Sequence, residues 1–250
     1  MAYIGRVAGV GATNEGNPVL LYGLSGRSPS SVSRMAVVHG GRVSIEPYGV
    51  MTLEQKAEAS RLVYDAIHTT RQWTPRGFVH FGIVSNGRQT GSIHRDYTEA
   101  IREGSFLSPP QNIISTALMR WGHEGKVGDR YDTPRIAGMI NVGSATAALG
   151  IITAENENRS QLHIARGFRN LTRGSMIYLS TYTGESAEPE APKFEAVSEA
   201  VKTRRIEGRT ARELAEEMYA FMDPEFVVAS AAALWVPQNE IWKLAAKNKN

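Results

Sequence analysis

Short runs of aliphatic and β-branched residues, separated by Gly, Asn, Pro and Ser, restrict this chain to a fold built mainly on β-sheets. The runs form two groups along the chain. They span residues 3–10, 18–25, 34–40, 42–49 and 77–87 in the first group and 135–142, 145–154, 161–168 and 175–184 in the second. The second group is almost continuously apolar, which is typical of strands covered on both faces.

Helix signals follow each group of strands. Thr52 and Gln55 form a capping-box pair, and an apolar stripe behind them predicts a helix over residues 52–71. A second predicted helix begins at Ser108 and carries apolar residues on one side as far as Trp121. Strands followed by helices, twice over, indicate an α+β protein with two stacked sheets and helices outside, a four-layer αββα sandwich.

The chain shows no linker before about residue 185, so we expect one main domain over residues 1–187. Residues 193–205 and 210–222 have helical patterns, the latter with Thr210 and Glu213 as a cap pair. We therefore expect residues 188–250 to be a mainly helical extension packed on the same domain. The run at 227–236 is either a core strand or an interface.

Composition excludes several functional classes. The 28 basic and 25 acidic residues give a net charge of only +3, which does not favour a nucleic-acid partner. Cysteine is absent, so disulfides, thiolate nucleophiles and thiolate metal sites are excluded. No apolar run approaches the roughly eighteen residues of a membrane span, and we expect a cytoplasmic protein without a membrane partner.

Familiar catalytic motifs are incomplete. GVGATN begins like a dinucleotide-binding turn, but Asn14 replaces the third glycine and another strand follows. GLSGR lacks the spacing of a nucleophile elbow at Arg27. The six histidines are scattered without metal-binding spacing, so we expect no metal. Enzymes with αββα folds commonly use an N-terminal nucleophile, which Met1-Ala2-Tyr3 does not offer.

One polar stretch, WGHEGKVGDRYDTPRIAGMIN at 121–141, raises the question of a reaction site. It places Glu124 just past a predicted helix, and Asp132 and Arg135 just before an apolar strand. On these residues alone, Glu124 is a solvated loop carboxylate and Asp132 either orients Arg135 or caps a turn. His123 adds no independent signal of an acid.

Seven segments carry a family resemblance. They are YIGRVAGVG (3–11), SGRS (25–28), EPYG (46–49), IVSNGRQT (83–90), DTPRIAGMIN (132–141), GIITAE (150–155) and YLSTYTGE (178–185). In this order they resemble the archaeal-type IMP cyclohydrolases over about residues 2–185. The resemblance implies an N-terminal-nucleophile-hydrolase-like fold without autoprocessing. It also implies that 5-formamidoimidazole-4-carboxamide ribonucleotide is closed to IMP with loss of water, without a cofactor.

The same resemblance implies three catalytic residues. An amide nitrogen must attack a formyl carbon, so the site needs a proton acceptor, a donor near the formyl oxygen and positive charge for the oxyanion. Glu124, Tyr48 and Arg27 match these roles in that order. Considered alone, Tyr48 is a strand-end tyrosine with its hydroxyl in water and Arg27 a surface residue in a serine-rich turn.

The candidate substrate contacts are Ser28, Asn86, Arg88, Arg135 and Asn141. Turn amides beside an arginine can hold a phosphate, and an asparagine offers both a donor and an acceptor to a purine edge. An Asn-Gly pair at residues 86–87 is equally well explained by a hairpin turn.

Two other functions remain as alternatives. One is a non-catalytic purine-nucleotide-binding or regulatory protein of the same fold. The other, a nucleic-acid-associated protein, is suggested only by the pI and by the basic stretch 202–212, whose interleaved glutamates favour a solvated surface instead. A homo-oligomer is compatible with the sequence.

Overall fold

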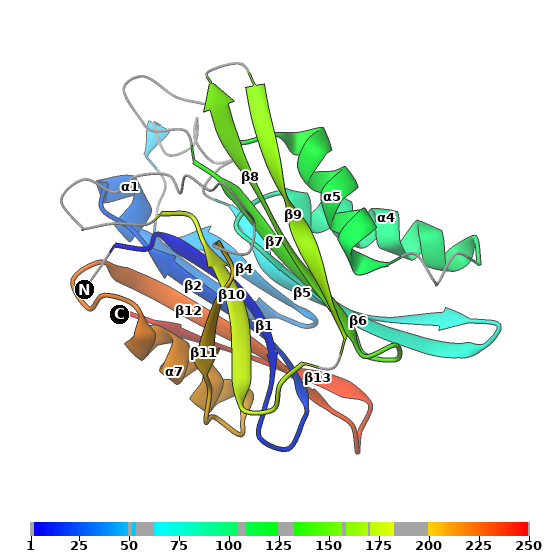
Figure 1. Cartoon of the computed structure of the whole chain (residues 1–250). Coiled ribbons are helices and arrows are strands. Elements are labelled where there is room, and N and C mark those ends of the chain that lie inside the picture. The colour runs from blue at the N-terminus through cyan, green and yellow to red at the C-terminus, as the bar shows by residue number, and fades with distance from the viewer. Residues whose placement is uncertain are drawn as a thin grey trace.

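The computed structural model describes residues 3–49, 52–53, 63–104, 109–124, 133–156, 159–169, 171–182 and 200–249. Over these residues the protein is an α+β fold of two mostly antiparallel sheets with four helices (Figure 1). None of the helices within these ranges is long and apolar enough to cross a membrane.

The first sheet has six strands in the order β11-β10-β1-β2-β12-β13. Their bounds are β1 Arg6–Ala12, β2 Pro18–Ser25, β10 Ser175–Ser180, β11 Lys202–Arg205, β12 Val227–Val236 and β13 Ile241–Asn248. Neighbouring strands pair antiparallel throughout. The sheet therefore combines strands from both ends of the chain.

The second sheet has seven strands in the order β3-β4-β5-β6-β7-β8-β9, which is also their order along the chain. Their bounds are β3 Arg34–His39, β4 Arg42–Pro47, β5 Tyr64–Thr74, β6 Gly77–Ser85, β7 Arg135–Asn141, β8 Thr146–Asn156 and β9 Arg159–Arg169. All neighbouring pairs are antiparallel. Consequently the ends of β4 and β6 and the starts of β5 and β7 lie at one edge of this sheet.

Three apolar clusters hold the elements together. The largest joins residues of β1, β2 and β12 to residues of β4–β8, so the sheets bury their facing sides against each other. In the second, α7 (Ala211–Phe221) packs on the first sheet. In the third, α4 (Gln89–Arg102) and α5 (Pro110–Trp121) pack on the second sheet. Each fully buried aliphatic side chain contributes about 1.5–3 kcal/mol.

Most of the predicted elements are confirmed. The nine predicted strands correspond to β1–β4 and β6–β10. The helix predicted from Ser108 is α5, which begins at Pro110 and buries Ile114 and Leu118 on one side. The Thr210–Glu213 capping box at the start of α7 is present in full.

The helix predicted over residues 52–71 is wrong from Tyr64 onward, where the chain forms β5. Residues 54–62 lie outside the described residues. Strand β5 is hydrogen-bonded to β4 on one side and β6 on the other, so its backbone groups are satisfied within the sheet. Its β-branched and aromatic residues pack in a sheet at least as well as in a helix, and tertiary pairing decides between the two.

The prediction of a mainly helical C-terminal extension is also wrong for the described residues 200–249. Apart from α7 this segment forms β11, β12 and β13. Strand β12 pairs with β2 and is buried along nearly its whole length, so 227–236 is a core strand. Its run of small apolar residues suits a strand enclosed between a sheet neighbour on each side and apolar layers above and below.

Two histidines stack between β5 and α4. The rings of His68 and His94 lie 3.9 Å apart between centroids and 4° from parallel. The pKa of His68 is lowered to about 4, chiefly by burial and also by His94 and Arg42, while Asp65 acts in the opposite direction. Burial likewise lowers the pKa of His94, with Arg42 adding to the effect and Asp65 opposing it.

This pair predicts acid sensitivity. An unfolded histidine has a pKa near 6.5, so between about pH 6.5 and pH 4 the unfolded chain binds a proton that the folded protein does not. Stability is therefore expected to fall by roughly 2–3 kcal/mol as the pH drops through this window. Urea unfolding at several pH values measures it, and His68→Gln is expected to flatten the dependence. An unchanged slope in that variant would remove His68 as the cause.

Candidate active site

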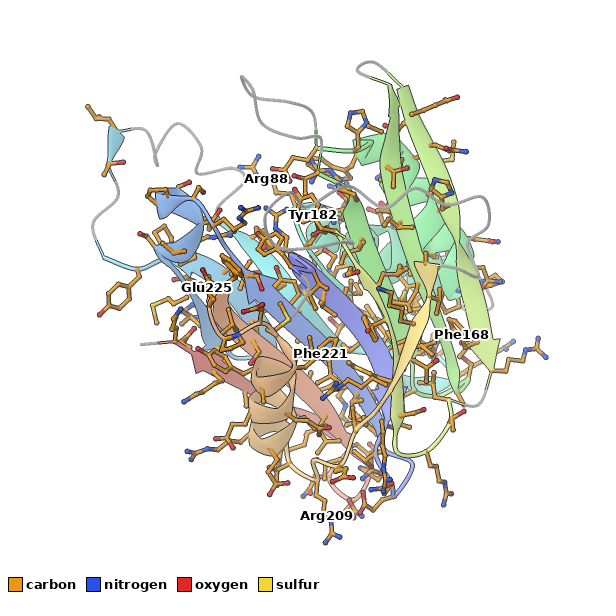
Figure 2. All side chains as sticks on the ribbon, turned by 60° about the vertical axis from the view of Figure 1, so that its left-hand side comes forward. Arg88, Phe168, Tyr182, Arg209, Phe221 and Glu225 are labelled. Atoms are coloured by element: carbon orange, nitrogen blue, oxygen red, sulfur yellow. The ribbon has the colours of Figure 1, made fainter. Side chains whose placement is uncertain are left out.

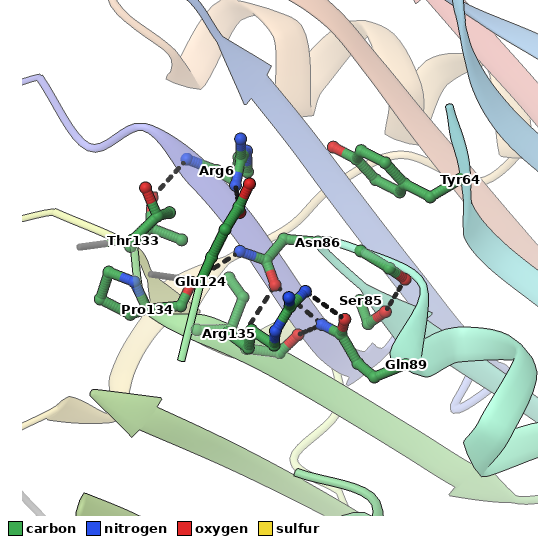
Figure 3. Close-up of polar contacts among 12 residues, drawn as sticks. Arg6, Tyr64, Ser85, Asn86, Gln89, Glu124, Thr133, Pro134 and Arg135 are labelled. Carbon is green, nitrogen blue, oxygen red and sulfur yellow. Dashed lines mark hydrogen bonds and ion pairs between the residues drawn. The ribbon is translucent and has the colours of Figure 1, made fainter. Parts of the chain in front are cut away.

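A part-buried ion pair links the start of β1 to Glu124, three residues past the end of α5. Arg6 at the start of β1 donates from Nη1 to Glu124 Oε2 at 3.2 Å, and their side chains are only 16% and 12% exposed (Figure 3). Thr181 fixes the backbone of Arg6 through hydrogen bonds of 2.9 Å in both directions. Thr133 fixes that of Glu124 through a pair of 3.0 Å bonds. The pair thus brings together residues 118 positions apart on supported backbone.

The electrostatics of Arg6 show how strongly the two charges interact. Burial is the largest single influence and acts to lower the pKa of Arg6, but the Glu124 carboxylate, together with Tyr64, Tyr22 and Tyr182, outweighs it, so the pKa lies above its ordinary value. In such a water-poor setting a paired carboxylate is held in one orientation and interacts strongly with a nearby charge or proton. The arrangement therefore suits a group that moves a proton at a fixed position.

Two tyrosine hydroxyls lie within the electrostatic reach of this pair. Tyr22 and Tyr64, both buried, share a hydrogen bond of 2.6 Å that links β2 to β5. Burial raises the pKa of Tyr22 well above its ordinary value, and the neighbouring Tyr64 adds to this, whereas Arg6 and Arg34 act to lower it. This phenol is accordingly protonated and acts as a hydrogen-bonding group rather than a base.

Further guanidinium groups gather around Tyr3. The guanidinium of Arg27 lies 5.5 Å from the ring centroid of Tyr3 and 5.8 Å from that of Phe226. The positive charges of Arg6, Arg34 and Arg27 all act to lower the pKa of Tyr3, although burial raises it overall. This end of the fold therefore brings several guanidinium groups together around Tyr3, an arrangement that favours anionic ligands.

A hydrogen-bonded turn after β6 supports the same edge. Asn86 donates from Nδ2 to the carbonyl of Pro134 at 2.8 Å, and its Oδ1 accepts from the backbone of Ile136 at 2.8 Å and from Gln89 at 2.9 Å (Figure 3). Arg135 in turn donates to Gln89 at 3.3 Å. The Asn-Gly pair is thus a strand-to-helix turn rather than a hairpin, and Asn86 ties it to the start of β7.

Replacing Asn86 by aspartate tests this role. The isosteric carboxyl group turns an oxygen instead of an amide donor toward the Pro134 carbonyl inside a buried site. We expect a loss of about 2–3 kcal/mol in the free energy of unfolding, measured by denaturant titration. The exposed turn residue Asn239 offers a matched control, since Asn239→Asp changes the same groups in water. Equal effects of the two substitutions would contradict the assignment.

The three predicted catalytic residues lie at one end of the fold but in different surroundings. Glu124 is part-buried beside Arg6, and Arg27 lies over Tyr3 within the same cluster of charges. The Tyr48 side chain is 60% exposed at the end of β4. Since β5 and β6 separate β4 from β7, the backbones of Tyr48 and Glu124 are roughly 14 Å or more apart.

The residues predicted to contact the substrate do not all lie near Arg6 and Glu124. The Ser28 hydroxyl caps the short helix α1 (Pro29–Val32) by accepting from the Ser31 backbone at 3.2 Å. Arg88 is exposed at the start of α4, at the same end of the molecule as Tyr182 (Figure 2). Asn141 donates to the hydroxyl of Tyr97 at the far end of β7. Six residues along a strand put it about 20 Å from Arg135, so the structure does not bring Asn141 to this edge.

Sequence reasoning missed several members of the cluster. Arg6 and Arg34 each open a strand whose following residues are apolar, and a lone cation at such a position is the signal that was available. The sequence around Tyr22 and Tyr64 gives no sign of a functional site, because their hydroxyls meet only when the two sheets pack against each other. Among the described residues, no three His, Asp or Glu side chains gather in a way that could hold a metal ion.

Comparison with known proteins identifies the family. The family model described as IMP cyclohydrolase-like protein matches residues 3–239. A Methanococcus maripaludis protein named IMP cyclohydrolase is 28% identical over 233 residues, covering 93% of this chain and 94% of its own. A Thermococcus kodakarensis protein of the same name is 28% identical over 173 residues, covering 69% and 73%. The match includes Arg6, Glu124 and most of the C-terminal strands, and the chain belongs to the IMP cyclohydrolase-like family.

Proposed function

We propose that this protein is an IMP cyclohydrolase, which closes 5-formamidoimidazole-4-carboxamide ribonucleotide to IMP and releases water in the last step of purine biosynthesis. A relative of that name aligns over nearly the full length of both chains. The observation that carries the proposal is the part-buried Arg6–Glu124 pair, because it provides a carboxylate held by one member of the arginine group around Tyr3. The substrate is a small-molecule purine nucleotide, and the cytoplasm is the expected location of this pathway.

The chemistry requires positioning and proton transfer. The carboxamide nitrogen forms a bond to the formyl carbon, and the formyl oxygen leaves as water with one proton from the carboxamide nitrogen and one from the formamide nitrogen. Both reacting groups belong to one molecule, so binding the correct conformer supplies much of the rate. Glu124 accepts and returns the protons, and Arg6 holds its carboxylate in place.

Positive charge near the formyl oxygen stabilises the developing oxyanion. We assign this role to Arg27, whose position over Tyr3 lies within the cluster that surrounds Arg6. For Tyr48 we do not adopt the donor role implied by the family resemblance, because its side chain is 60% exposed and β5 and β6 lie between β4 and β7. We propose instead that Tyr48 contacts the nucleotide away from the ring-closing atoms.

The remaining contacts divide into direct and supporting ones. Arg88 and Arg135 flank the turn after β6 and are proposed to contact the substrate. Asn86 supports them from within the fold, since both of its amide atoms already bond to the protein. Ser28 shapes the start of α1, and Asn141 is left out of the site. We also propose that the two sheets and their helices form an N-terminal-nucleophile-hydrolase-like αββα sandwich.

A direct assay tests the function. The purified protein is mixed with 5-formamidoimidazole-4-carboxamide ribonucleotide without added metal, and IMP formation is followed by ultraviolet absorbance. We expect catalysed IMP formation above the uncatalysed rate. Tight IMP binding without turnover would favour the alternative, a non-catalytic nucleotide-binding protein, and the absence of both would overturn the proposal.

A further inference from the structure

A buried guanidinium with an unsatisfied nitrogen lies next to the cluster of charges. Arg34 is 4% exposed, and its Nε donates to the carbonyl of Ser31 at 3.0 Å. Its Nη1 is buried without a hydrogen-bond partner among the described residues. Burying a charged donor in this way is strongly unfavourable unless a counter-charge is supplied, so the residue calls for an explanation.

The charged and titratable groups around Arg34 do not supply a carboxylate. Burial lowers its pKa, and the positive charge of Arg6 lowers it further, while the hydroxyls of Tyr64, Tyr22 and Tyr3 act in the opposite direction. None of these neighbours carries a carboxylate. The surroundings therefore leave the positive charge of Arg34 without an anionic partner from these residues.

Arg34 also forms part of the wall of a small pocket between the ends of the two sheets, here called the Arg34 pocket. Its lining comprises Val32, Arg34, Met35, Tyr48, Val227, Val228, Asn248 and Lys249. The volume of about 50 Å³ is several times the roughly 10–15 Å³ that one water requires. The lining contains two cations, a phenol and an amide but no Asp or Glu, a combination that suits an anion with several acceptor oxygens.

The wall of the Arg34 pocket is held in place by strand contacts. The Asn248 side chain accepts from the backbone of Ala36 at 2.7 Å and donates to its carbonyl at 3.1 Å, which ties β13 to β3. Lys249 donates from Nζ to the carbonyl of Glu225 at 3.0 Å. Arg34 pairs with Pro47 across β3 and β4, and the backbone of Lys249 donates to the carbonyl of Val228 at 3.0 Å, so both cations are carried by hydrogen-bonded backbone, as a binding site requires.

We propose that the Arg34 pocket binds the phosphate of the purine nucleotide, with the Arg34 guanidinium as its principal ligand. This inference rests on the proposed function and deepens it by orienting the substrate. The phosphate lies beside Tyr48 and Lys249, and the base extends toward Arg6 and Glu124. Arg34 is suited to this arrangement because it both lines the pocket and lies within the electrostatic reach of Arg6.

The decisive measurement compares ligands with and without a phosphate. Isothermal titration of the wild type is expected to show IMP binding about 10- to 100-fold more tightly than inosine, the range of a charge-assisted contact. In Arg34→Met this ratio is expected to fall close to one while inosine affinity is unchanged. Inorganic phosphate is expected to raise the melting temperature of the wild type but not of Arg34→Met.

A matched control removes the same charge elsewhere. Arg42 lies at the opposite end of the β3–β4 pair, half exposed and 3.5 Å from Asp65. Arg42→Met is expected to retain the wild-type ratio of IMP to inosine affinity. A loss of the ratio in both variants would attribute the effect to overall charge and overturn the proposal.

Stability separates a ligand-binding role from a structural one. Removing an unpaired buried charge is expected to leave the melting temperature of the ligand-free protein unchanged or raised, whereas a structural role predicts a large fall. If Arg34→Met does not fold, Arg34→Lys decides: an IMP-to-inosine ratio at least about tenfold below the wild type supports the proposal, because lysine lacks the planar fork. An unchanged ratio in the folded variant overturns it.

The two proposals can fail independently. If IMP binds more tightly than inosine, this preference is lost in Arg34→Met, and no IMP is formed, the Arg34 pocket is supported and the proposed activity is wrong. If the wild type closes the ring and Arg34→Met keeps the full preference for IMP over inosine, the proposed activity stands and the phosphate site at the Arg34 pocket is wrong.

Discussion

Glu124→Gln is expected to slow IMP formation by about 10²- to 10⁴-fold while IMP binding is largely retained. The amide keeps the shape of the side chain and can still accept a hydrogen bond from Arg6, but it cannot take up a proton at working pH. Turnover should therefore fall through kcat, with little change in KM. Steady-state kinetics monitored by ultraviolet absorbance measures both parameters.

A surface glutamate provides the matched control. Glu216 pairs with Arg212 at 3.1 Å on the exposed face of α7, so Glu216→Gln makes the same chemical change in a solvated ion pair. It is expected to have wild-type kinetics. If Glu124→Gln also turned over at close to the wild-type rate, Glu124 would have no part in proton transfer and the proposed mechanism would be abandoned.

The helices and strands that could be predicted are those whose sequence signals are local. Strand β2 has continuous apolar residues bounded by turn residues, and α7 has a capping box followed by a 3.6-residue period, so neither depends on distant contacts. Strand β5 failed because its residues fit a helical stripe equally well. Its identity is decided by hydrogen bonds to β4 and β6, which a local pattern does not contain.

Helix α4 was missed for a related reason. It follows β6 directly, and the side chain of its N-cap residue, Arg88, forms no capping hydrogen bond. The turn is held instead by Asn86 bonding to β7, about fifty residues further along the chain. Strand β11 was likewise obscured, because the charged residues on this exposed edge strand resemble a helical pattern.

The site was only partly accessible from sequence. Glu124 was identified through the family resemblance, since its own neighbourhood is that of a loop carboxylate. The ion-pair partner of Glu124 is Arg6, which lies 118 positions earlier at the start of β1, so the local sequence around Glu124 does not reveal it. Arg34 shows the same limit: its sequence context is a strand start, and only the packed structure reveals a buried nitrogen without a partner.

Arg6→Met is expected to destabilise the protein by about 2–4 kcal/mol, because the substitution leaves the Glu124 carboxylate in a largely water-excluded site without the Arg6 guanidinium. Turnover is expected to fall at least about tenfold, since a carboxylate that is no longer held in one orientation transfers protons less effectively. Denaturant unfolding and steady-state kinetics on the same preparations measure the two effects.

A double variant separates the structural contribution of the pair from the catalytic one. Combining Arg6→Met with Glu124→Gln removes both charges, so part of the stability lost in Arg6→Met should return, and the stability effects of the two single substitutions should not add. Activity should not return, because the proton carrier is gone. Strictly additive losses of stability would mean that the two charges do not interact in solution. Recovery of turnover in the double variant would mean that the pair serves the fold and that another group moves the proton.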